Sequence, residues 1–465
     1  MNGSTLMLSI SGLRGLIGGS LTPPVAARYG AAVGSWMRDS TGKNAPHIVV
    51  GRDSRPSGPM IERAAVAGLI AVGCRVTTLG IASTPGTAIM VEQLRADGGL
   101  VITASHNPIV WNGIKTLRHD GLAPPPAQAQ QIVEQFHRDE PRYVDVHALE
   151  TALENDTAAA VHIDRVLPHI DAATIRRAGL KVVLDSNFGA GGPEALGLLQ
   201  ELGVEVIGLG TEPTGRFAHE PEPTRENLTG LCERMSQGGA AVGFAQDPDA
   251  DRLALVDETG RYIGEEYTLA LCAMHVLQRA VPLGADGGRP RVVVANLSTS
   301  RMIDDIAERF GAICIRTPVG EANVAEAIRL HSAVFGGEGN GGVILPGVCF
   351  VRDSLVGMAL VLEMLATGGG KLSDLVAQIP SYAIVKDKLP IEPGMAGRTV
   401  ERLRDAFAGE RIDVQDGIRV DLDASRSWAH VRPSNTEPIL RIIAEAPTQA
   451  VARELIHRCR AAIGA

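Results

Sequence analysis

Short apolar runs alternate with helix-like stretches along most of the chain. A β-branched run at 48–53 is followed by a helical pattern from about Pro59 to Val72, and then by a second run at 75–80. Another helical stretch leads into an apolar run that begins at Gly99. Short apolar runs separated by helical segments are typical of βαβ units. The pattern therefore predicts a mixed or parallel sheet flanked by helices.

This texture recurs twice more along the chain. The runs 180–185 and 290–298 each open a new round of strand, turn and helix. A round spans roughly 100–140 residues, which is the size of one domain. The architecture repeats, although no residue-level repeat is visible. We therefore expect three similar α/β domains with mixed sheets, at 1–152, 153–258 and 259–370.

The last segment, 371–465, has a different pattern. Several β-rich runs, the last at 439–446, precede an amphipathic helix at 448–463. Successive strands closed by a helix predict an antiparallel sheet in an α+β domain. The glycine run 368–370 marks the boundary before this fourth domain, and the boundary near 258 falls in a predicted hairpin turn.

Composition narrows the classes of function. The 465 residues carry a net charge of −9, only 3% are aromatic, and no Lys/Arg-rich run is present. This disfavours nucleic-acid binding, which depends on phosphate neutralisation and base stacking. No apolar run approaches the roughly 20 residues of a membrane span, and the start of the chain lacks a signal-peptide pattern. The six cysteines are scattered, without a C-x-x-C pair. We therefore expect a cytoplasmic protein with reduced thiols and no membrane partner.

The first segment with candidate chemistry is TASHNP, residues 103–108. It follows an apolar run, so Ser105 is expected in a loop at the carboxyl end of a strand, where α/β sites usually lie. A serine hydroxyl needs a base, a metal or charge stabilisation to act as a nucleophile. His106, Asn107 and Lys115 could supply polar and cationic support. The alternative is an ordinary turn, since Ser-His-Asn-Pro is a good turn sequence.

The second segment places three carboxylates at alternate positions: Asp247, Asp249 and Asp251. Three like charges this close repel one another and favour a cation, and oxygen ligands of this kind suit Mg²⁺. A solvated acidic turn is one alternative. An EF-hand calcium loop is another, because Glu258 occupies its twelfth position. Arg252 stands where that loop needs glycine, and the flanking residues read as strands, which disfavours it.

The third segment is the glycine-rich loop 336–342. Its glycines let a backbone approach a ligand closely. Glu338 and Asn340 within it could hydrogen-bond vicinal hydroxyls of a sugar. The alternative is a common glycine-rich turn.

The fourth segment is RPSNTEP, residues 432–438, with Arg441 nearby. Hydroxyls, an amide, loop N–H groups and a guanidinium are the groups that bind a phosphate dianion. The alternative is a turn between strands. The candidate phosphate ligands are Arg432, Ser434, Asn435, Thr436 and Arg441.

The four segments together specify one reaction. They supply a serine that could carry a phosphoryl group, a metal site, a hydroxyl-reading loop and a phosphate clamp. They fall in four successive predicted domains, so we expect an active-site cleft where all four domains meet.

These segments, in this order, resemble the α-D-phosphohexomutase superfamily, which includes phosphoglucosamine mutase, phosphomannomutase and phosphoglucomutase. The resemblance covers essentially the whole chain, and the segments 11–15 and 51–58 add to it. It implies a four-domain, heart-shaped architecture with three α/β domains and a smaller C-terminal domain. The GEGNGG and SNTEP segments look most like the branch labelled phosphoglucosamine mutase of the archaeal type.

The resemblance also implies a mechanism. Ser105 would be phosphorylated in the resting enzyme, and a phosphoserine oxygen would join the three aspartates around one Mg²⁺ per chain. The bound sugar phosphate would take the phosphoryl group from Ser105 and become a hexose 1,6-bisphosphate, which also serves as activator. The bisphosphate would turn by about half a rotation and return its other phosphate to Ser105.

Basic residues would assist this transfer. The resemblance makes Arg14, Lys115 and Arg252 candidates to stabilise charge and to help proton transfer, with His106 and Asn107 supporting the phosphoserine loop. Each of the three cations has an alternative role, which is to pair with a carboxylate and organise the loop.

The sequence departs from many relatives at three positions. They have Ser and His at the places of Asn340 and Gly342, and His at the place of Glu321. Glu321 could replace one histidine as acid/base or as a sugar contact, or it could be a carboxylate that begins a helix.

The resulting hypothesis is an isomerase that converts glucosamine 6-phosphate to glucosamine 1-phosphate. The alternative is the same chemistry on glucose and mannose phosphates with broad specificity. A more remote alternative is a non-catalytic sugar-phosphate-binding paralogue, which loss of Ser105 or of an Asp ligand would favour, and none is lost. Expected partners are small sugar phosphates, and the chain is expected to be a monomer or a homodimer.

Overall fold

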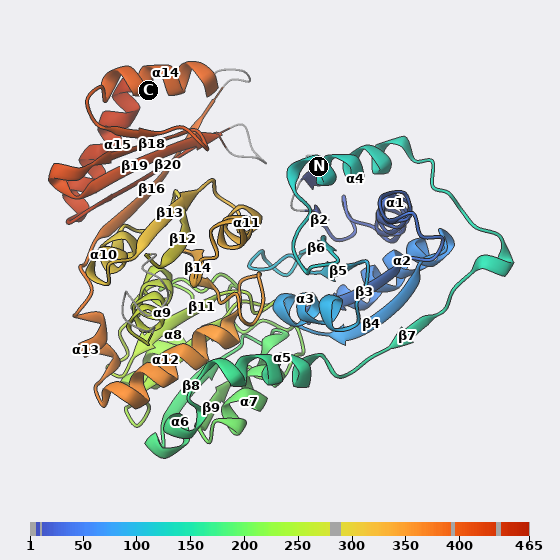
Figure 1. Cartoon of the computed structure of the whole chain (residues 1–465), viewed down its shortest axis with the longest axis horizontal. Coiled ribbons are helices and arrows are strands. Elements are labelled where there is room, and N and C mark those ends of the chain that lie inside the picture. Colours follow the sequence, from blue (N-terminus) through green and yellow to red (C-terminus); the bar gives the residue numbers. More distant parts are fainter. Residues whose placement is uncertain (1–5, 10–11, 280–289, 392–395, 434–438, 465) are drawn as a thin grey trace. The chain divides into compact units, whose positions relative to one another are not determined.

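The computed structural model describes residues 6–9, 12–279, 290–391, 396–433 and 439–464. The chain divides into two compact units. Figure 1 labels their helices and strands, coloured along the sequence. Unit 1 contains Met1–His275 and Asn340–Val376, and unit 2 contains Val276–Gly339 and Ala377–Ala465.

Unit 1 begins with a seven-stranded mixed sheet in the order β1-β2-β6-β5-β3-β4-β7. Strands β3, β4, β5 and β7 run parallel, and β6, β2 and β1 are added in antiparallel pairs. The mixed sheet that the apolar runs predicted is therefore confirmed. The strands are β1 (Met7–Ser9), β2 (Gly12–Leu16), β3 (His47–Arg52), β4 (Arg75–Ile81), β5 (Gly98–Ile102), β6 (Trp111–Arg118) and β7 (Ala152–Glu154).

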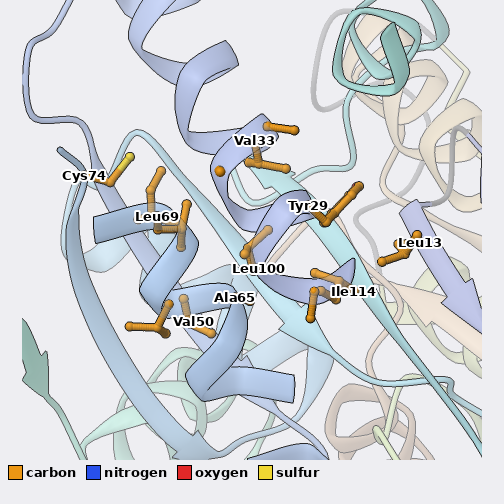
Figure 2. Packing of buried hydrophobic residues seen from close by; sticks show 14 of the residues in the cluster. Leu13, Tyr29, Val33, Val50, Ala65, Leu69, Cys74, Leu100 and Ile114 are labelled. Atoms are coloured by element: carbon orange, nitrogen blue, oxygen red, sulfur yellow. The ribbon is translucent and has the colours of Figure 1, made fainter. Parts of the chain in front are cut away.

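Helices cover both faces of this sheet. Residues of α1, α2 and α4 share one apolar cluster with Val50 and Leu100 of the sheet (Figure 2). Gly99, which alternates with Leu100 along β5, faces Val91 of α3 on the other side. The helices are α1 (Pro23–Thr41), α2 (Gly58–Ala71), α3 (Thr84–Gln93) and α4 (Pro126–Arg138), with the short η1 (Val146–Ala148) after them.

The packing of α1 on α2 explains two glycines. A Cβ at Gly30 would lie 2.2 Å from the Ala65 carbonyl oxygen, and one at Gly68 would lie 2.0 Å from that of Ala27. A larger side chain at either position would force the helices apart and open the cluster shown in Figure 2.

A second sheet of unit 1 has the order β11-β10-β8-β9. Its first three strands in the sequence are parallel, and β11 returns antiparallel to β10. The strands are β8 (Lys181–Asp185), β9 (Glu205–Leu209), β10 (Val242–Gln246) and β11 (Leu253–Asp257). The accompanying elements are α5 (Ala158–Val166), η2 (Leu167–His169), α6 (Ala172–Ala178), α7 (Gly191–Glu201), α8 (Thr229–Ser236), β15 (Gly342–Ile344), α12 (Ser354–Gly368) and α13 (Leu372–Val376).

Unit 2 contains two smaller sheets. In the first, β12 (Val292–Asn296) lies between β13 (Ile313–Thr317) and β14 (Phe335–Glu338), all parallel. The helices of this part are α10 (Met302–Arg309) and α11 (Glu321–His331), and α9 (Glu265–Arg279) leads into the unit.

The second sheet of unit 2 is antiparallel, in the order β16-β20-β19-β18-β17. This confirms the α+β expectation for the last segment. Its elements are β16 (Ala383–Pro390), α14 (Ala396–Ala406), β17 (Arg411–Asp413), β18 (Ile418–Leu422), η3 (Asp423–Ser425), β19 (Ser427–Pro433), β20 (Ile439–Ala446) and α15 (Gln449–Ile463). Among the described residues, no helix combines the length and the apolar character needed to cross a membrane.

Candidate active site

Ser105 lies in a tight loop between β5 and β6. Its backbone φ is 48°, a left-handed conformation that residues other than glycine seldom adopt. Thr103 stabilises the turn, because its hydroxyl oxygen accepts the Ser105 N–H at 2.9 Å. Ser105 is 3% exposed, and its Oγ donates to Asp247 Oδ2 at 2.8 Å. The serine and the acidic segment that the sequence singled out are therefore in direct contact.

Asp247, Asp249 and Asp251 occupy the turn of the hairpin formed by β10 and β11. All three are fully buried, and one carboxylate oxygen from each lies within 4.8 Å of the others. Because strands rather than helices flank this turn, the EF-hand alternative is wrong. The alternative of a solvated acidic turn is also wrong, since the carboxylates are inaccessible to solvent.

The triad carries an electrostatic cost. Burial and the neighbouring charges of Asp249 and Asp251 raise the pKa of Asp247 well above its usual value. Burial also opposes ionisation of Asp249, but Lys115 and Thr84 outweigh it and lower its pKa. Burial also opposes ionisation of Asp251, but Arg352, Lys115 and Arg252 together outweigh it and lower the pKa of Asp251 as well. Asp249 and Asp251 are thus held ionised, and their negative charges oppose ionisation of Asp247.

Two carboxylate oxygens of the triad are left for a cation. Asp249 Oδ1 and Asp251 Oδ1 are buried and have no hydrogen-bond partner among the described residues. A buried charged oxygen without a partner costs free energy. Hard divalent cations take oxygen ligands of this kind. The triad could therefore hold a metal ion.

The other oxygens of the triad are fixed from several elements. Lys115 on β6 places its Nζ 2.7 Å from Asp249 Oδ2 and 3.3 Å from Asp251 Oδ2. Thr84 at the start of α3 donates to Asp249 Oδ2 at 2.6 Å. Arg352 donates to Asp251 Oδ2 at 2.6 Å. Sequence reasoning missed Thr84 and Arg352, because no local motif links either residue to an acidic turn so distant along the chain.

The remaining predicted residues of unit 1 surround Ser105. His106 Nδ1 lies 3.4 Å from Ser105 Oγ, and burial together with Arg252 and Arg14 lowers the pKa of His106 to about 3. The imidazole is therefore neutral at physiological pH. Arg14 donates to Asn107 Oδ1 at 2.8 Å, so it holds the loop from β2.

Arg252 follows the triad directly. Its backbone N–H donates to Asp247 Oδ1 at 3.1 Å. Its Nε lies 3.8 Å from Asp251 Oδ1, and this nitrogen has no hydrogen-bond partner among the described residues. The guanidinium thus stands next to one of the oxygens that are left for a cation.

Arg352 also explains why this chain has glycine at position 342, where many relatives have histidine. A Cβ at Gly342 would lie only 2.1 Å from Arg352 Cδ, so the arginine stem fills the space of a side chain there. A histidine at this position would collide with Arg352. Asn340, two residues earlier, accepts the Gly342 N–H at 3.2 Å through its Oδ1.

In unit 2, Glu338 ends β14 and is 5% exposed. Its Oε1 accepts the Asn296 amide at 2.8 Å and the Gly320 N–H at 3.2 Å. Asn296 ends the neighbouring strand β12, so the carboxyl ends of two parallel strands meet here. This edge is where α/β folds commonly place ligand contacts.

Arg432 is linked to the same edge through Asp416. Its Nε donates to Asp416 Oδ2 at 2.9 Å, and that oxygen also accepts the Val319 N–H at 3.1 Å. Val319 and Gly320 form the turn that contacts Glu338. Glu338 and Arg432 are therefore linked through one short turn and Asp416, a link that sequence spacing did not reveal.

Arg441 is exposed on β20, directly opposite Arg432 on β19 and Lys388 on β16. Opposite residues of antiparallel strands share a face, so three cations are aligned there, which favours an anion. Glu321 is the first residue of α11, where the helix dipole favours a carboxylate. The predicted ligands Ser434, Asn435 and Thr436 lie outside the described residues.

Comparison with known families identifies the chain. Four family models match in succession: phosphoglucomutase/phosphomannomutase α/β/α domain I at 7–143, domain II at 160–260, domain III at 265–382 and the C-terminal domain at 384–462. The matches follow one another over nearly the entire length.

Relatives and a solved structure agree with these matches. A probable phosphoglucosamine mutase of Methanopyrus kandleri is 38% identical, over 96% of this chain and 95% of that protein. A phosphoglucomutase/phosphomannomutase of Thermococcus kodakarensis is 37% identical, over 96% of each. A phosphoglucomutase/phosphomannomutase family protein of Burkholderia thailandensis has a TM-score of 0.84 at 27% identity, covering 99% of this chain and 98% of that one.

These similarities define the class of protein. The chain is a phosphomutase, that is, an intramolecular phosphotransferase of the isomerase type. It belongs to the phosphoglucomutase/phosphomannomutase family of phosphohexomutases.

Proposed function

We propose that this phosphohexomutase interconverts hexose 6-phosphate and hexose 1-phosphate through a phosphorylated Ser105. The contact that supports this most directly is the hydrogen bond of Ser105 Oγ to Asp247 at 2.8 Å. Asp249 and Asp251 each add a buried carboxylate oxygen that has no hydrogen-bond partner in the described part of the chain. A nucleophilic serine needs charge stabilisation of this kind. If residues 105–108 were only a turn, nothing would explain why Ser105 is buried beside three aspartates with a left-handed backbone.

The proposed reaction consists of two reciprocal transfers. The bond between phosphorus and Ser105 Oγ breaks as a sugar hydroxyl oxygen bonds to phosphorus, and the proton of that hydroxyl passes to Ser105 Oγ. The product is a hexose 1,6-bisphosphate. After the bisphosphate turns around, its other phosphoryl group passes to Ser105 Oγ, and the proton of Ser105 passes to the released sugar oxygen. The net result is an isomerisation, with the phosphoserine restored.

Asp247, Asp249 and Asp251 would hold Mg²⁺, joined by a phosphoserine oxygen. When bound, the ion would offset negative charge on the transferring group. Lys115, Arg14 and Arg252 would stabilise the same charge from the protein side. His106 and Asn107 would keep the loop in place, since neutral His106 lies 3.4 Å from Ser105 Oγ.

Unit 2 would recognise the sugar phosphate. Glu338 would hydrogen-bond the sugar hydroxyl or amine groups. Asn340, which belongs to unit 1, is proposed as a further sugar ligand from the family resemblance. The existing phosphate would bind Arg432 and Arg441, supported by their alignment on one face of the C-terminal sheet. The neighbouring clamp residues Ser434, Asn435 and Thr436 are proposed from the family resemblance. Glu321 is proposed as a further acid/base or sugar contact.

We infer glucosamine 6-phosphate as the preferred substrate. The 38%-identical Methanopyrus relative carries the name probable phosphoglucosamine mutase, which supports this choice. The 37%-identical Thermococcus relative is named for glucose and mannose phosphates, which supports broad specificity as the second candidate.

A comparison of substrates tests the proposal. Purified protein is assayed with Mg²⁺ and a trace of hexose 1,6-bisphosphate on glucosamine, N-acetylglucosamine, glucose and mannose phosphates. We expect the highest kcat/KM for the glucosamine phosphate. A larger kcat/KM for glucose or mannose phosphate, or values that differ by only a few-fold, would assign the broad specificity instead.

A further inference from the structure

Arg55 lies beneath the loop that carries Ser105. Its side chain is fully buried. Its Nη1 donates to the carbonyl oxygens of Pro108 and Trp111 at 2.9 and 3.1 Å. Its Nη2 donates to those of Ser105 and Asn107, both at 2.6 Å. One guanidinium therefore binds four carbonyl groups of a seven-residue loop.

The fifth N–H group of Arg55 is also used. Nε donates to Asp53 Oδ2 at 3.0 Å, and the pair is completely buried. A guanidinium has five N–H donors in a rigid fork, and here each has an acceptor. Arg55 consequently has no donor left for a phosphate, which separates it from the basic residues that face the triad.

Asp53 extends the connection to the serine itself. Its Oδ2 accepts the Thr103 hydroxyl at 2.7 Å, and the oxygen of that hydroxyl accepts the Ser105 N–H at 2.9 Å. Asp53 also accepts the Arg55 N–H at 3.0 Å through Oδ1. Both ends of the strained turn at Ser105 are thus tied to one buried ion pair.

A second part of unit 1 packs on this ion pair. The Phe217 ring lies 5.1 Å from Arg55 Cζ, within cation–π range. Ser54 Oγ donates to the Phe188 carbonyl oxygen at 2.8 Å. Gly215, at φ 69°, approaches so closely that a Cβ there would lie 2.0 Å from the Ser54 carbonyl oxygen. These contacts hold Arg55 and the adjacent Ser54 against a part of unit 1 other than the loop.

We propose that Arg55 is a positioning residue for phosphoryl transfer. With Asp53 and Thr103 it fixes the loop 105–111, so that Ser105 keeps its left-handed backbone and points its hydroxyl at the aspartate triad. This inference rests on the proposed role of Ser105. It assigns a function to the segment 51–58, to which neither the motif analysis nor the family comparison gave a role.

The decisive variant is Arg55→Lys, which keeps the charge but loses the five-donor fork. Arg52→Lys is the matched control, because Arg52 is the last residue of β3, three residues before Arg55, and its Nε pairs with Glu62 at 3.0 Å. We expect Arg55→Lys to lower kcat about 100-fold, with KM changed less than threefold, since small misplacements of reacting groups cost rates of this order. Arg52→Lys should behave like the wild type.

A second readout is independent of catalysis. Hydrogen–deuterium exchange of the peptide 103–113 should be faster in Arg55→Lys than in the wild type, with other peptides of unit 1 unchanged. If Arg55→Lys does not fold, Thr103→Val decides, because it removes only the hydroxyl between Asp53 and Ser105. It should lower kcat about tenfold and also speed exchange of the same peptide.

Two results would overturn the inference. One is a variant, Arg55→Lys or Thr103→Val, that folds and shows both the wild-type kcat and the wild-type rate of hydrogen–deuterium exchange in the peptide 103–113. The other is a raised KM at unchanged kcat, which would make Arg55 a substrate contact. The Ser105→Ala variant distinguishes a failure of the positioning role from a failure of the proposed function. If Ser105→Ala is fully active, the phosphoserine proposal fails. If it is inactive while Arg55→Lys behaves like the wild type, only the positioning role fails.

Discussion

Ser105 combines three features that seldom occur together in a serine. It is buried, it adopts a left-handed backbone, and its hydroxyl faces a cluster of buried carboxylates. Strained and desolvated groups of this kind persist where surrounding contacts fix them, and they concentrate at active sites. The contacts here come from Thr103, Arg55 and Asp247.

Thr84 offers a direct test of the metal-binding arrangement at the scale of single residues. Its hydroxyl donates to Asp249 Oδ2 at 2.6 Å, which leaves Asp249 Oδ1 for a cation. Thr84→Val keeps the shape and removes this hydrogen bond. We expect Mn²⁺ or Mg²⁺ to bind about 10–100-fold more weakly, as measured by calorimetry, because partners that orient metal ligands contribute to this extent.

Thr87→Val is the matched control for this change. Thr87 is buried in the same helix, and its hydroxyl donates to the Ser83 carbonyl oxygen, away from the triad. Its metal affinity should equal that of the wild type. Equal affinity in Thr84→Val and in the control would show that Thr84 does not orient a ligand.

Sequence reasoning found the residues that stand in short, dense motifs. Ser105 follows an apolar run, and the three aspartates alternate in one turn, so local spacing alone indicated their chemistry. Thr84, Arg352 and Asp416 were missed for one physical reason. Each acts on a residue far away in the sequence, and only the folded sheets bring the partners together.

At the scale of elements, a buried histidine joins three helices of unit 1. His162 of α5 places Nε2 2.7 Å from Asp353 Oδ2 and Nδ1 3.4 Å from Glu194 Oε2 of α7. Asp353 also caps α12, accepting the N–H groups of Leu355 and Val356. Burial opposes protonation of His162, but the two carboxylates outweigh it and raise its pKa to about 10.

His162→Gln should destabilise the fold in a pH-dependent manner. The folded pKa of about 10 exceeds the ordinary value of 6.5, so the protonated imidazole contributes its full stability below pH 6.5. This contribution is lost as the pH rises towards 10. We expect the variant to lose about 3–5 kcal/mol in free energy of unfolding at pH 6, because two buried carboxylates lose their cation.

Urea unfolding of the wild type and of His162→Gln between pH 6 and 10 measures this effect. The difference between them should shrink with rising pH. His331→Gln, an exposed substitution in α11, should leave the free energy of unfolding unchanged. A difference that is constant or that grows with pH would contradict a protonated His162.

Predicted strands and helices agreed with the structure where the apolar pattern was long enough. The runs at 48–53 and 180–185 became β3 and β8, within one residue at each end. The helix expected after the run 180–185 is α7, which begins at Gly191. The sequence analysis missed β17 and α14. β17 has only three residues, too few to show an alternation of apolar and polar positions, and α14 is rich in charged residues.

At the scale of the whole molecule, the sequence correctly predicted three α/β parts and an antiparallel C-terminal part. Such architecture follows from element order, which the apolar pattern reveals. The boundaries 152/153, 258/259 and 370/371 stay predictions. Composition could not locate these boundaries. The glycine run 368–370, for example, lies at the C-terminal end of helix α12 and does not mark a long linker.

Metal binding should stabilise the whole protein through the triad. Mg²⁺ at 100 times its Kd should raise the free energy of unfolding by about 2.7 kcal/mol over the same protein in EDTA. Asp251→Asn should abolish most of this increase, because it removes the negative charge of a carboxylate whose Oδ1 has no hydrogen-bond partner among the described residues. Thermal unfolding with and without Mg²⁺ measures both.

Asp257→Asn serves as the control for this measurement. Asp257 is equally buried at the end of β11, but its partners are Thr259 and Arg261 rather than the triad. Its response to Mg²⁺ should match that of the wild type. An unchanged response in Asp251→Asn would place the cation elsewhere.

The most direct test of the central claim follows the phosphoryl group itself. Protein treated with hexose 1,6-bisphosphate carrying labelled phosphate is digested, and the label is located and then chased with unlabelled hexose phosphate. The account predicts label on Ser105 that leaves for the sugar at least as fast as the enzyme turns over, and none on Ser105→Ala. Label on another residue, or undiminished activity in Ser105→Ala, would contradict it.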